Sequence, residues 1–424
     1  MNWKSALFAS VLVSSLALPS HASDWPQFRG PGGAGVSALT NMPLKWSGDA
    51  DIAWKTALPG PGSSCPAVFG ERIYLTCFTG YGMSKETPGE MTNLTYHLLC
   101  IDARDGKIIW DRAVKAVTPV VEYKSQVTLH GYTSSTPAVD DKGVVVFFAN
   151  TGVCAWRHDG TQVWATSVGA KTHNWHSGTS PVLYRDTVIV NACIESGSLI
   201  GLHRETGARA WSVGDIVMSW STPLIVDIAG RAEAVVMSKG MIRACDPLTG
   251  TLRWTCTGID DYICPSPVAA NGVVYGIGAR RNEAMAVRAG GSGDVTASNV
   301  LWRVRKGSNV SSPVWYEGNL YFANEKEATV YCIDASSGEV KYEEKLAPST
   351  GLIYASPLVA DGKLYYVSRE NGTFVLPASP VFKVLAQNRI AGDGSVFNAS
   401  PVPLAHGRLL LRSDKALYCI KAGK

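Results

Sequence analysis

Two short segments of the chain carry the histidines best placed to do chemistry. His130 stands two residues before Tyr132, and His173 and His176 flank Trp175. Imidazoles can hold a metal ion or act as a general acid or base, and an indole ring can stack on a ligand. No carboxylate or third ligand follows at a fixed spacing on either segment. The pattern therefore favours a ligand or partner site over a metal centre or a catalytic set.

A pair of acids, Asp260 and Asp261, directly precedes Tyr262. Paired carboxylates can serve as acid and base or hold a calcium ion. An acidic pair in an exposed loop more often caps the backbone. We favour that interpretation and keep the three residues as candidates for binding.

The remaining candidates share their setting with those above, since each stands a few residues before a proline. They are Trp220, Asn309, Tyr354 and Asn398. Trp220 and Tyr354 stand at the same place, three residues before their prolines, which indicates a packing role for these two. Packing and ligand binding remain open as explanations of the whole set.

These prolines recur with a fixed period. They are Pro66, Pro137, Pro181, Pro223, Pro267, Pro313, Pro357 and Pro401. After a first gap of 71 residues, the spacings are 44, 42, 44, 46, 44 and 44 residues. A period in the forties is typical of folds built by repeating one supersecondary unit.

Each unit reads as four short strands. A step such as Asn271-Gly272 can close a tight hairpin, and a turn such as residues 102–106 is followed, four residues after its glycine, by an aromatic residue. Eight such units without a long helical pattern predict an all-β fold, an eight-bladed β-propeller of four-stranded blades. Six tryptophans are expected to dock each blade on its neighbour: Trp54, Trp110, Trp164, Trp211, Trp254 and Trp302.

The ring is expected to close through the N-terminal part of the chain. The eighth unit ends near residue 421 without a fourth strand, whereas a spare strand at residues 52–56 precedes the first unit. We expect that strand to complete the last blade, because closure removes free sheet edges. The propeller then covers residues 52–424. An N-terminal arm at residues 23–51 is expected to pack along the outside of the ring or to stay loose.

The turn-and-tryptophan motif resembles that of the quinoprotein-type (PQQ-like) propeller repeat family. Residues 100–110 (CIDARDGKIIW) and 244–254 (ACDPLTGTLRW) carry it, and the match covers roughly residues 52–421. The resemblance implies the same propeller fold. It extends to quinone-dependent dehydrogenases and to proteins like the outer-membrane-protein assembly factor B. Residues 24–31 (DWPQFRGP) also resemble the mature start of secreted propellers of planctomycete type.

The resemblance does not extend to a cofactor site. Quinone-dependent dehydrogenases hold the quinone between a tryptophan and a disulfide of adjacent cysteines, with calcium ligands and a catalytic aspartate. This chain has ten cysteines but no Cys-Cys pair. No catalytic residue of those enzymes can be placed here. No cofactor is expected, although PQQ and calcium stay open without a motif that supports them.

Cysteines in an exported chain raise the question of disulfides. Cys65–Cys77 or Cys256–Cys264 could be bridged, although we favour free thiols. Four others stand six residues before the turn glycine or its equivalent, where we expect buried thiols beneath the docking aromatic residue: Cys100, Cys154, Cys332 and Cys419.

The first 22 residues read as a secretory signal peptide. Lys4 supplies the charge, residues 6–18 the apolar core and residues 20–22 a small-x-small cleavage site. The rest carries 38 basic and 35 acidic groups without a basic tract, so a nucleic-acid partner is not expected. No other long apolar segment predicts a membrane span, and no lipobox cysteine occurs. We expect a periplasmic or secreted protein, monomeric.

Two segments break the repeat, residues 79–95 and 111–134. Loops of this length in a compact fold are often functional, and these could cover the channel mouth or present a partner surface. The sequence favours an exported, non-catalytic propeller that binds or scaffolds a protein, a peptide or a glycan at the channel mouth. The alternative is a quinone (PQQ)-dependent oxidoreductase. A hydrolase or lyase using the histidines has no motif behind it.

Overall fold

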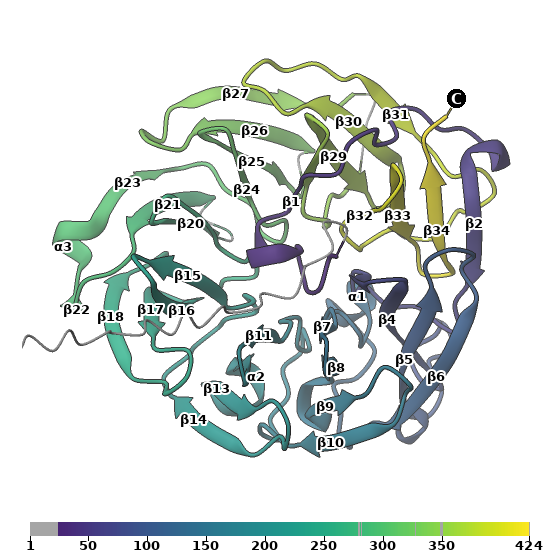
Figure 1. Cartoon of the computed structure of the whole chain (residues 1–424), viewed down its shortest axis with the longest axis horizontal. Helices are drawn as coiled ribbons and strands as arrows, with labels where there is room; N and C mark the ends of the chain where they lie inside the picture. The colour runs from purple at the N-terminus through teal and green to yellow at the C-terminus, as the bar shows by residue number, and fades with distance from the viewer. Residues whose placement is uncertain (1–23, 279, 281, 327, 348–350, 424) are drawn as a thin grey trace, which may run out of the picture.

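The structure, a computed structural model, describes residues 24–278, 280, 282–326, 328–347 and 351–423. The expected signal peptide at residues 1–22 lies outside them. Eight antiparallel sheets, each with a core of four strands, form a ring around a central channel (Figure 1). The predicted eight-bladed all-β propeller is therefore confirmed. No helix in the described ranges is long and apolar enough to span a bilayer.

The first four blades follow one another in chain order, and each runs from the channel outward. Blade one comprises β3 (Ala67–Phe69), β4 (Arg72–Thr79), β5 (Thr95–Asp102) and β6 (Ile108–Lys115). Blade two comprises β7 (Ala138–Asp140), β8 (Gly143–Phe147), β9 (Val153–Trp156) and β10 (Gln162–Thr166). Blade three comprises β11 (Val182–Tyr184), β12 (Thr187–Ala192), β13 (Ser198–His203) and β14 (Arg209–Val213). Blade four comprises β15 (Leu224–Ile228), β16 (Arg231–Ser238), β17 (Met241–Cys245) and β18 (Leu252–Thr257).

The last four blades continue the ring. Blade five comprises β19 (Val268–Ala270), β20 (Val273–Gly278), β21 (Glu283–Arg288) and β23 (Val300–Val304). Blade six comprises β24 (Val314–Tyr316), β25 (Asn319–Asn324), β26 (Thr329–Asp334) and β27 (Val340–Lys345). Blade seven comprises β28 (Leu358–Ala360), β29 (Lys363–Ser368), β30 (Gly372–Pro377) and β31 (Ala386–Asn388). Blade eight comprises β32 (Val402–Leu404), β33 (Arg408–Arg412), β34 (Ala416–Lys421) and β2 (Ile52–Ala57).

The strand sequences match their places in a blade. Middle strands such as β8 and β12 are buried at every position, because neighbouring blades cover both of their faces. Outer strands such as β10 and β14 are buried mainly at their central tryptophan. Continuous apolar runs therefore mark the middle of each blade, and alternating runs mark its rim.

The predicted closure is confirmed. Strand β2 lies antiparallel to β34 at the rim of blade eight, with Trp54 opposite Cys419. A segment near the start of the propeller thus completes its last sheet (Figure 1). This pairing ties the two ends of the ring together by backbone hydrogen bonds.

A second closure, which sequence reasoning missed, runs around the channel. The backbone N–H of the residue before each recurring proline donates to a side chain at the equivalent position of the next blade, and the eight bonds form a complete cycle. Seven acceptors are hydroxyl oxygens of Ser or Thr at 2.9–3.0 Å. The eighth is Sγ of Cys65, 3.2 Å from the nitrogen of Ser400. This ring explains why Ser or Thr precedes the proline in the other blades.

The docking tryptophans contact the next blade at its turn glycine. A Cβ atom on Gly207 would lie 2.5 Å from the Trp164 indole, and φ at this glycine is 69°. The indole Nε1 of Trp164 donates to the carbonyl oxygen of Arg204 at 3.0 Å. Trp54, Trp110 and Trp302 donate to the next blade in the same way, at 3.3, 3.0 and 2.9 Å. Only a residue without a side chain allows this contact.

Two tryptophans depart from this pattern. Trp254 donates instead to the Glu233 carboxylate of its own blade at 2.6 Å. In blade five the equivalent turn is replaced by an excursion in which β22 (Gly293–Asp294) pairs with β18 and the helix α3 (Thr296–Asn299) follows. Among described residues, Nε1 of Trp211 has no hydrogen-bond acceptor.

The expectation for the N-terminal arm was wrong. Trp25 pairs with Val68 of β3, and β1 (Val36–Ser37) pairs in parallel with β28, so the arm crosses the channel (Figure 1). The short 3-10 helix η1 (Pro31–Gly33) lies between these anchors. Only residues further along, such as Trp46, reach the outer strand β31. The innermost strands offer unpaired backbone edges to the channel, and the arm pairs with two of them.

The ten cysteines are free thiols; nine of them are buried and Cys264 is half-buried. Cys100, Cys332 and Cys419 lie opposite the docking aromatic residue of the neighbouring strand. Cys154 does not, because Trp164 pairs with Ala155 instead. The turn of blade two is one residue tighter, which places this thiol on the other face of the sheet.

Candidate functional site

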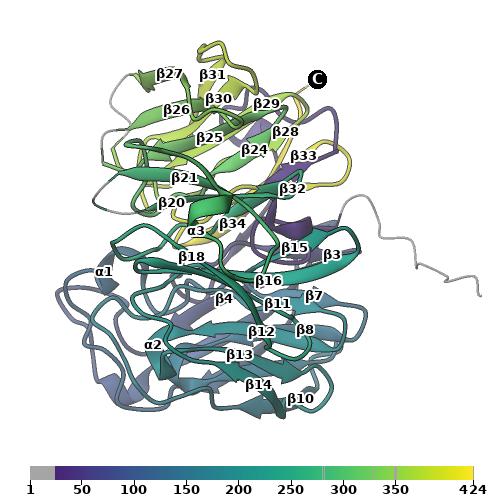
Figure 2. The ribbon, with the colours of Figure 1, turned by 90° about the vertical axis from the view of Figure 1, so that its left-hand side faces the viewer.

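The predicted site residues lie at one end of the channel. All blades run in the same sense, so the loops that lead into the innermost strands share one end, which we call the mouth. The mouth comprises residues 129–136, 173–180, 217–222, 260–266, 305–312, 352–356 and 393–400. The arm crosses the opposite end, the arm end. In Figure 2 the mouth faces left, where α1 (Val127–His130) lies.

Four predicted residues form one aromatic cluster at the mouth. The Trp175 ring lies 4.9 Å from that of Trp220 and 4.7 Å from that of Tyr262, between ring centroids. His173 stands edge-on at 5.0 Å from Trp220. Trp220 and Tyr262 are buried, whereas Trp175 and His173 are half-buried. The structure thus presents an indole and an imidazole to solvent on a fully packed aromatic base.

Hydrogen bonds fix this cluster to neighbouring blades. Nε1 of Trp220 donates to the carbonyl oxygen of His176 at 2.7 Å, and the Tyr262 hydroxyl donates to Oδ1 of Asn309. The backbone N–H of Asn309 donates to the Glu325 carboxylate at 2.9 Å. Because four blades share these bonds, the exposed ring of Trp175 stands on a rigid support.

A second group closes the other side of the mouth around one backbone carbonyl. The carbonyl oxygen of Leu129 accepts Nη1 of Arg369 at 2.9 Å and Nδ2 of Asn398 at 2.8 Å. The Arg369 guanidinium lies 4.6 Å from the ring centroid of Tyr354. Tyr354 and Asn398 therefore contribute to holding α1, while Arg369 is a mouth residue that sequence reasoning missed.

The two histidines next to this group are neutral near pH 7. Desolvation lowers the pKa of His130 to about 4, and burial lowers the pKa of His176 to about 3. Nδ1 of His130 bonds to the Ser134 hydroxyl at 2.8 Å, and the His176 ring stands edge-on to Tyr132 at 5.2 Å. These imidazoles pack between blades and would be poor proton donors.

The acidic pair does not converge on the cluster. Asp260 is exposed. The carboxylate of Asp261 accepts the backbone N–H of Tyr262 at 2.8 Å and that of Arg280 at 3.1 Å. These contacts are those of a loop cap. The Arg280 guanidinium lies 5.4 Å from the Tyr262 centroid and adds a positive charge beside the aromatic cluster.

The two blade-one insertions pack on each other beside the mouth. The Tyr132 ring lies 5.8 Å from Tyr81 and 5.9 Å from Tyr123, which come from the two insertions. The backbone N–H of Tyr123 donates to the Tyr81 hydroxyl at 3.0 Å, and the Tyr132 hydroxyl donates to the Val121 carbonyl at 2.8 Å. The insertions thus form an ordered wall along one side of the mouth.

Behind the cluster lies a buried acid that no sequence signal marked. Glu195 sits in the short helix α2 (Cys193–Ser196) and is 2% exposed. Neither of its carboxylate oxygens has a hydrogen-bond partner among the described residues. Burial raises the pKa of Glu195 to about 8. Its neighbour Ile194 packs against the aromatic cluster, so the acid stands directly behind the mouth.

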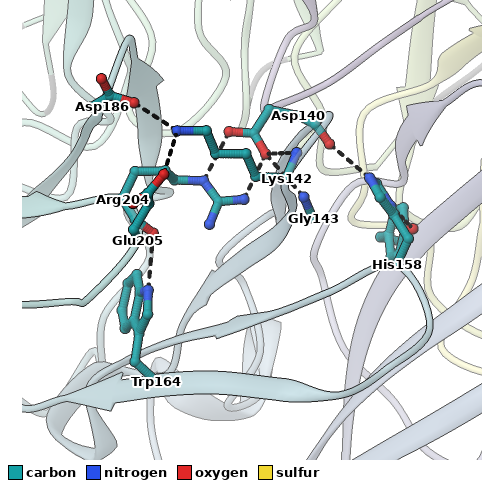
Figure 3. A network of polar contacts seen from close by, with 9 residues as sticks. Asp140, Lys142, Gly143, His158, Trp164, Asp186, Arg204 and Glu205 are labelled. Carbon is teal, nitrogen blue, oxygen red and sulfur yellow. Dashed lines mark hydrogen bonds and ion pairs between the residues drawn. The ribbon is translucent and has the colours of Figure 1, made fainter.

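The arm end is held by a network of charged groups instead (Figure 3). The buried Arg204 guanidinium donates to both carboxylate oxygens of Asp140 at 2.8 and 2.6 Å, which joins blades two and three. Nζ of Lys142 bonds to Asp186 at 2.7 Å and to Glu205 at 3.2 Å. These residues lie in turns of different blades, and no pattern in the sequence connects them.

Two cavities lie at the arm end. One of about 240 Å³ lies between the arm and the innermost strands of blades three to five. A second, of about 370 Å³, lies beside it against blades two and three. The mouth thus carries a packed aromatic cluster, whereas the arm end contains two cavities that open to solvent.

The mouth does not fit a quinone with calcium. No group of three or more His, Cys, Asp or Glu side chains with metal-binding geometry occurs among the described residues. Asp261 is engaged by backbone N–H groups, and all ten cysteines are single free thiols. The disulfide of adjacent cysteines that would cover a quinone is therefore not provided here.

Comparison with known proteins identifies relatives by sequence and by fold. A family profile described as outer membrane protein assembly factor BamB matches residues 95–287 and 291–378. The assembly factor BamB of Yersinia pestis is 23% identical over 342 residues, covering 74% of this chain and 76% of that protein. The tetrathionate hydrolase of Acidithiobacillus ferrooxidans is 21% identical over 355 residues, covering 74% of this chain but only 64% of the hydrolase.

Among solved structures, a europium-containing methanol dehydrogenase superposes with a TM-score of 0.66. The superposition covers 92% of this chain and 89% of the dehydrogenase, and the two sequences are 12% identical. This likeness shows the shared fold.

Proposed function

Because the chain belongs to the family of outer membrane protein assembly factor BamB, we propose that it is an exported, non-catalytic propeller that binds a protein partner at its mouth. The observation that carries this proposal is the partly exposed Trp175 on a buried aromatic base. Tryptophan anchors on rigid supports dominate the binding energy of many protein interfaces.

The surroundings of Trp175 support a protein partner. Arg280 and the half-buried His173 lie beside the cluster, and the wall made by residues 79–95 and 111–134 flanks it. An aromatic centre with polar and cationic residues around it is the usual composition of a protein interface. Peptides and glycans also stack on such aromatic surfaces, and the experiments below separate them from folded proteins.

The chemistry of the mouth supports a role without catalysis. Its two buried histidines are neutral, and Asp261 caps a loop. No nucleophile among the described mouth residues has a base and an orienting third group beside it in the hydrogen bonds found. A general acid or base would need a pKa near the working pH, and the imidazoles at positions 130 and 176 are far below it.

The test is site-specific crosslinking in the native host. A photo-activatable phenylalanine replaces Trp175 in one strain and Val163, which is 43% exposed on the rim strand β10, in a matched control strain. We expect a discrete protein adduct at position 175 only. It should disappear when His173→Ala and Arg280→Ala remove the flanking contacts. Equal adducts at both positions, or none at 175, would remove the mouth from the interface.

Enzymatic alternatives are tested on the purified full chain. Addition of PQQ and calcium, with alcohols and a dye acceptor, should give neither dye reduction nor a shifted melting temperature. Tetrathionate should not be hydrolysed. Saturable binding with turnover of either substrate would overturn the non-catalytic proposal.

Export is tested by fractionation and N-terminal sequencing. We expect the mature protein in the periplasm or medium, starting at Ser23 after removal of residues 1–22. A full-length cytoplasmic chain would contradict export.

A further inference from the structure

The innermost strand of each blade turns the backbone of one residue toward the channel. In an antiparallel hairpin, hydrogen-bonded pairs alternate with pairs whose N–H and C=O groups point away from the partner strand. In blade three, Tyr184 and Thr187 close a two-residue turn as a hydrogen-bonded pair, so the backbone groups of Leu183 point to the channel. The residue two after each recurring proline is placed in the same way, and we call these the channel-edge residues: Val68, Val139, Leu183, Ile225, Ala269, Trp315, Val359 and Pro403.

The arm supplies partners for three channel-edge residues. The N–H group of Val68 donates to the carbonyl oxygen of Trp25 at 2.8 Å. That of Val139, in the next blade, donates to the carbonyl oxygen of Pro26 at 2.8 Å, and that of Val359 donates to an arm carbonyl at 2.9 Å. Because Trp25 and Pro26 are adjacent in the sequence and reach adjacent blades, an extended chain can pair with one blade per residue.

Blades three to six lack such a partner. Their channel-edge residues are Leu183, Ile225, Ala269 and Trp315, and none of their N–H groups donates to the backbone of another segment among the described residues. All four residues are partly exposed, whereas the three that pair with the arm are buried. In blade eight the equivalent residue is Pro403, which has no N–H group to pair. The free edge is therefore one continuous arc of four blades.

The cavity of about 240 Å³ makes this arc accessible from solvent. Leu183 and Ile225 both line it, and most of its other walls are apolar, including Phe28 of the arm. The arm passes over the arc without pairing with it, and the buried Arg29 ties it to the carbonyl oxygen of Pro313 in blade six. A free backbone edge between apolar walls is the composition of a site that binds an added strand.

We propose that an extended peptide segment of a partner protein binds in this cavity by pairing with the free edge at Leu183 and Ile225. Its carbonyl oxygens accept the two N–H groups, its own N–H groups donate to the carbonyl oxygens of the same residues, and its apolar side chains lie against the apolar walls. The arm is the precedent, because it pairs with the same positions of blades seven, one and two. An anion supplies acceptors only and would leave the carbonyl oxygens of the edge unpaired. This site lies at the arm end and does not depend on the partner site at the mouth.

The experiment measures binding of the peptide acetyl-Ser-Val-Leu-Val-Ser-amide to the full chain by calorimetry. The comparison ligand is the same peptide with methyl groups on the backbone nitrogens of its three apolar residues, which removes donors and keeps the side chains. We expect the unmodified peptide to bind and to slow hydrogen exchange at residues 182–184 and 224–226. The methylated peptide should bind about tenfold more weakly or not at all, as expected for lost backbone hydrogen bonds.

Ile225→Pro removes one N–H group of the free edge, and Pro403 shows that blade eight already carries proline at the equivalent position. This variant should bind the unmodified peptide about tenfold more weakly than the wild type. Ile225→Val is the matched control, because it keeps the N–H group and an apolar side chain, and it should bind like the wild type. If Ile225→Pro fails to fold, Leu183→Pro tests the neighbouring blade, and the two peptides compared on the wild type decide the question on their own.

Equal binding of the two peptides, no binding of the unmodified peptide, or unchanged affinity in a folded Ile225→Pro variant would each overturn the proposal. A dimer of the chain that forms without peptide and dissociates in Ile225→Pro would show that the edge pairs with a second copy instead, and would overturn it as well.

Discussion

The two ends of the channel solve the same problem, joining eight blades, in different ways. At the arm end the repeat supplies the joints: a tryptophan on the glycine of the next blade, and the Asp140–Arg204 pair. At the mouth the ring of hydrogen bonds before the prolines is regular, whereas the joints beyond it are irregular, built from Trp175, Trp220 and their neighbours. Repetition therefore marks structure in this chain, and departure from it marks the surface available for binding. At the arm end the buried Arg204 is paired with Asp140, whereas the buried Glu195 behind the mouth has no partner among the described residues.

The largest expected effect tests the unpaired acid behind the mouth. Burial raises the pKa of Glu195 from 4.5 to about 8, so between these values the folded state holds a proton that the unfolded state has lost. The free energy of unfolding should therefore fall as pH rises from about 4.5 to 8, by up to roughly 4 kcal/mol. Glu195→Gln should remove this fall. Urea unfolding at pH 5, 6.5 and 8 measures it.

Two buried histidines in the same region also make stability depend on pH, and the comparison with the wild type must separate their contribution. His130 and His176 have lowered pKa values, so they reduce stability in the opposite direction, as pH falls below about 6.5. The difference between Glu195→Gln and the wild type cancels their contribution. Parallel stability curves for the two proteins from pH 5 to 8 would show that the carboxylate is not desolvated.

The next effect tests the paired charges of the arm end (Figure 3). Asp140→Asn leaves the buried Arg204 without its counter-charge and should lower the free energy of unfolding by about 3 kcal/mol. Lys142→Met removes a partly exposed ion pair of the same network and should cost under about 1 kcal/mol. Denaturant unfolding of the two variants compares them directly. Equal losses would mean that burial does not distinguish these pairs.

The hydrogen-bond ring around the channel predicts a smaller effect. Ser312→Ala removes the acceptor of the Ser266 N–H and should lower the free energy of unfolding by about 1–2 kcal/mol. The adjacent Ser311 is a matched control, because its buried hydroxyl has no hydrogen-bond partner among the described residues. Ser311→Ala should be close to neutral by the same unfolding measurement. A reversed order of the two losses would argue against the ring as a stabilising element.

The smallest effect concerns the one thiol in that ring. Cys65→Ser restores the residue type used by the other blades, and a hydroxyl is a better acceptor than a thiol for the Ser400 N–H. The free energy of unfolding should change by less than about 1 kcal/mol, with a gain expected. Intact-mass analysis should meanwhile find ten reduced cysteines in the native protein. A loss above 2 kcal/mol, or a disulfide at Cys65, would contradict this assignment.

Part of the candidate site was accessible to sequence reasoning. The period places His173, Trp175, Trp220 and Tyr262 in loops that enter neighbouring blades, so their approach follows from the repeat. Their contacts do not, because they depend on how adjacent loops pair, as in the bridge between Ser219 and Ile263. From the sequence, a packing role and a binding role are therefore equally consistent with these four residues. The structure separates them, because Trp220 and Tyr262 are buried whereas His173 and Trp175 are partly exposed.

Residue patterns alone specify the fold: eight units of four strands, the strand at residues 52–56 that closes the last blade, and the end of the channel on which the irregular loops meet. The period of the repeat and the alternation of apolar and polar residues carry that information, because each unit is built from hairpins between strands that are neighbours in the sequence. The position of the arm, the unpaired acid Glu195 and the burial of Arg29 become visible only in the folded chain. Desolvation and pairing of Glu195, Arg204 and Arg29 depend on segments distant in the chain, and no local pattern of residues encodes them.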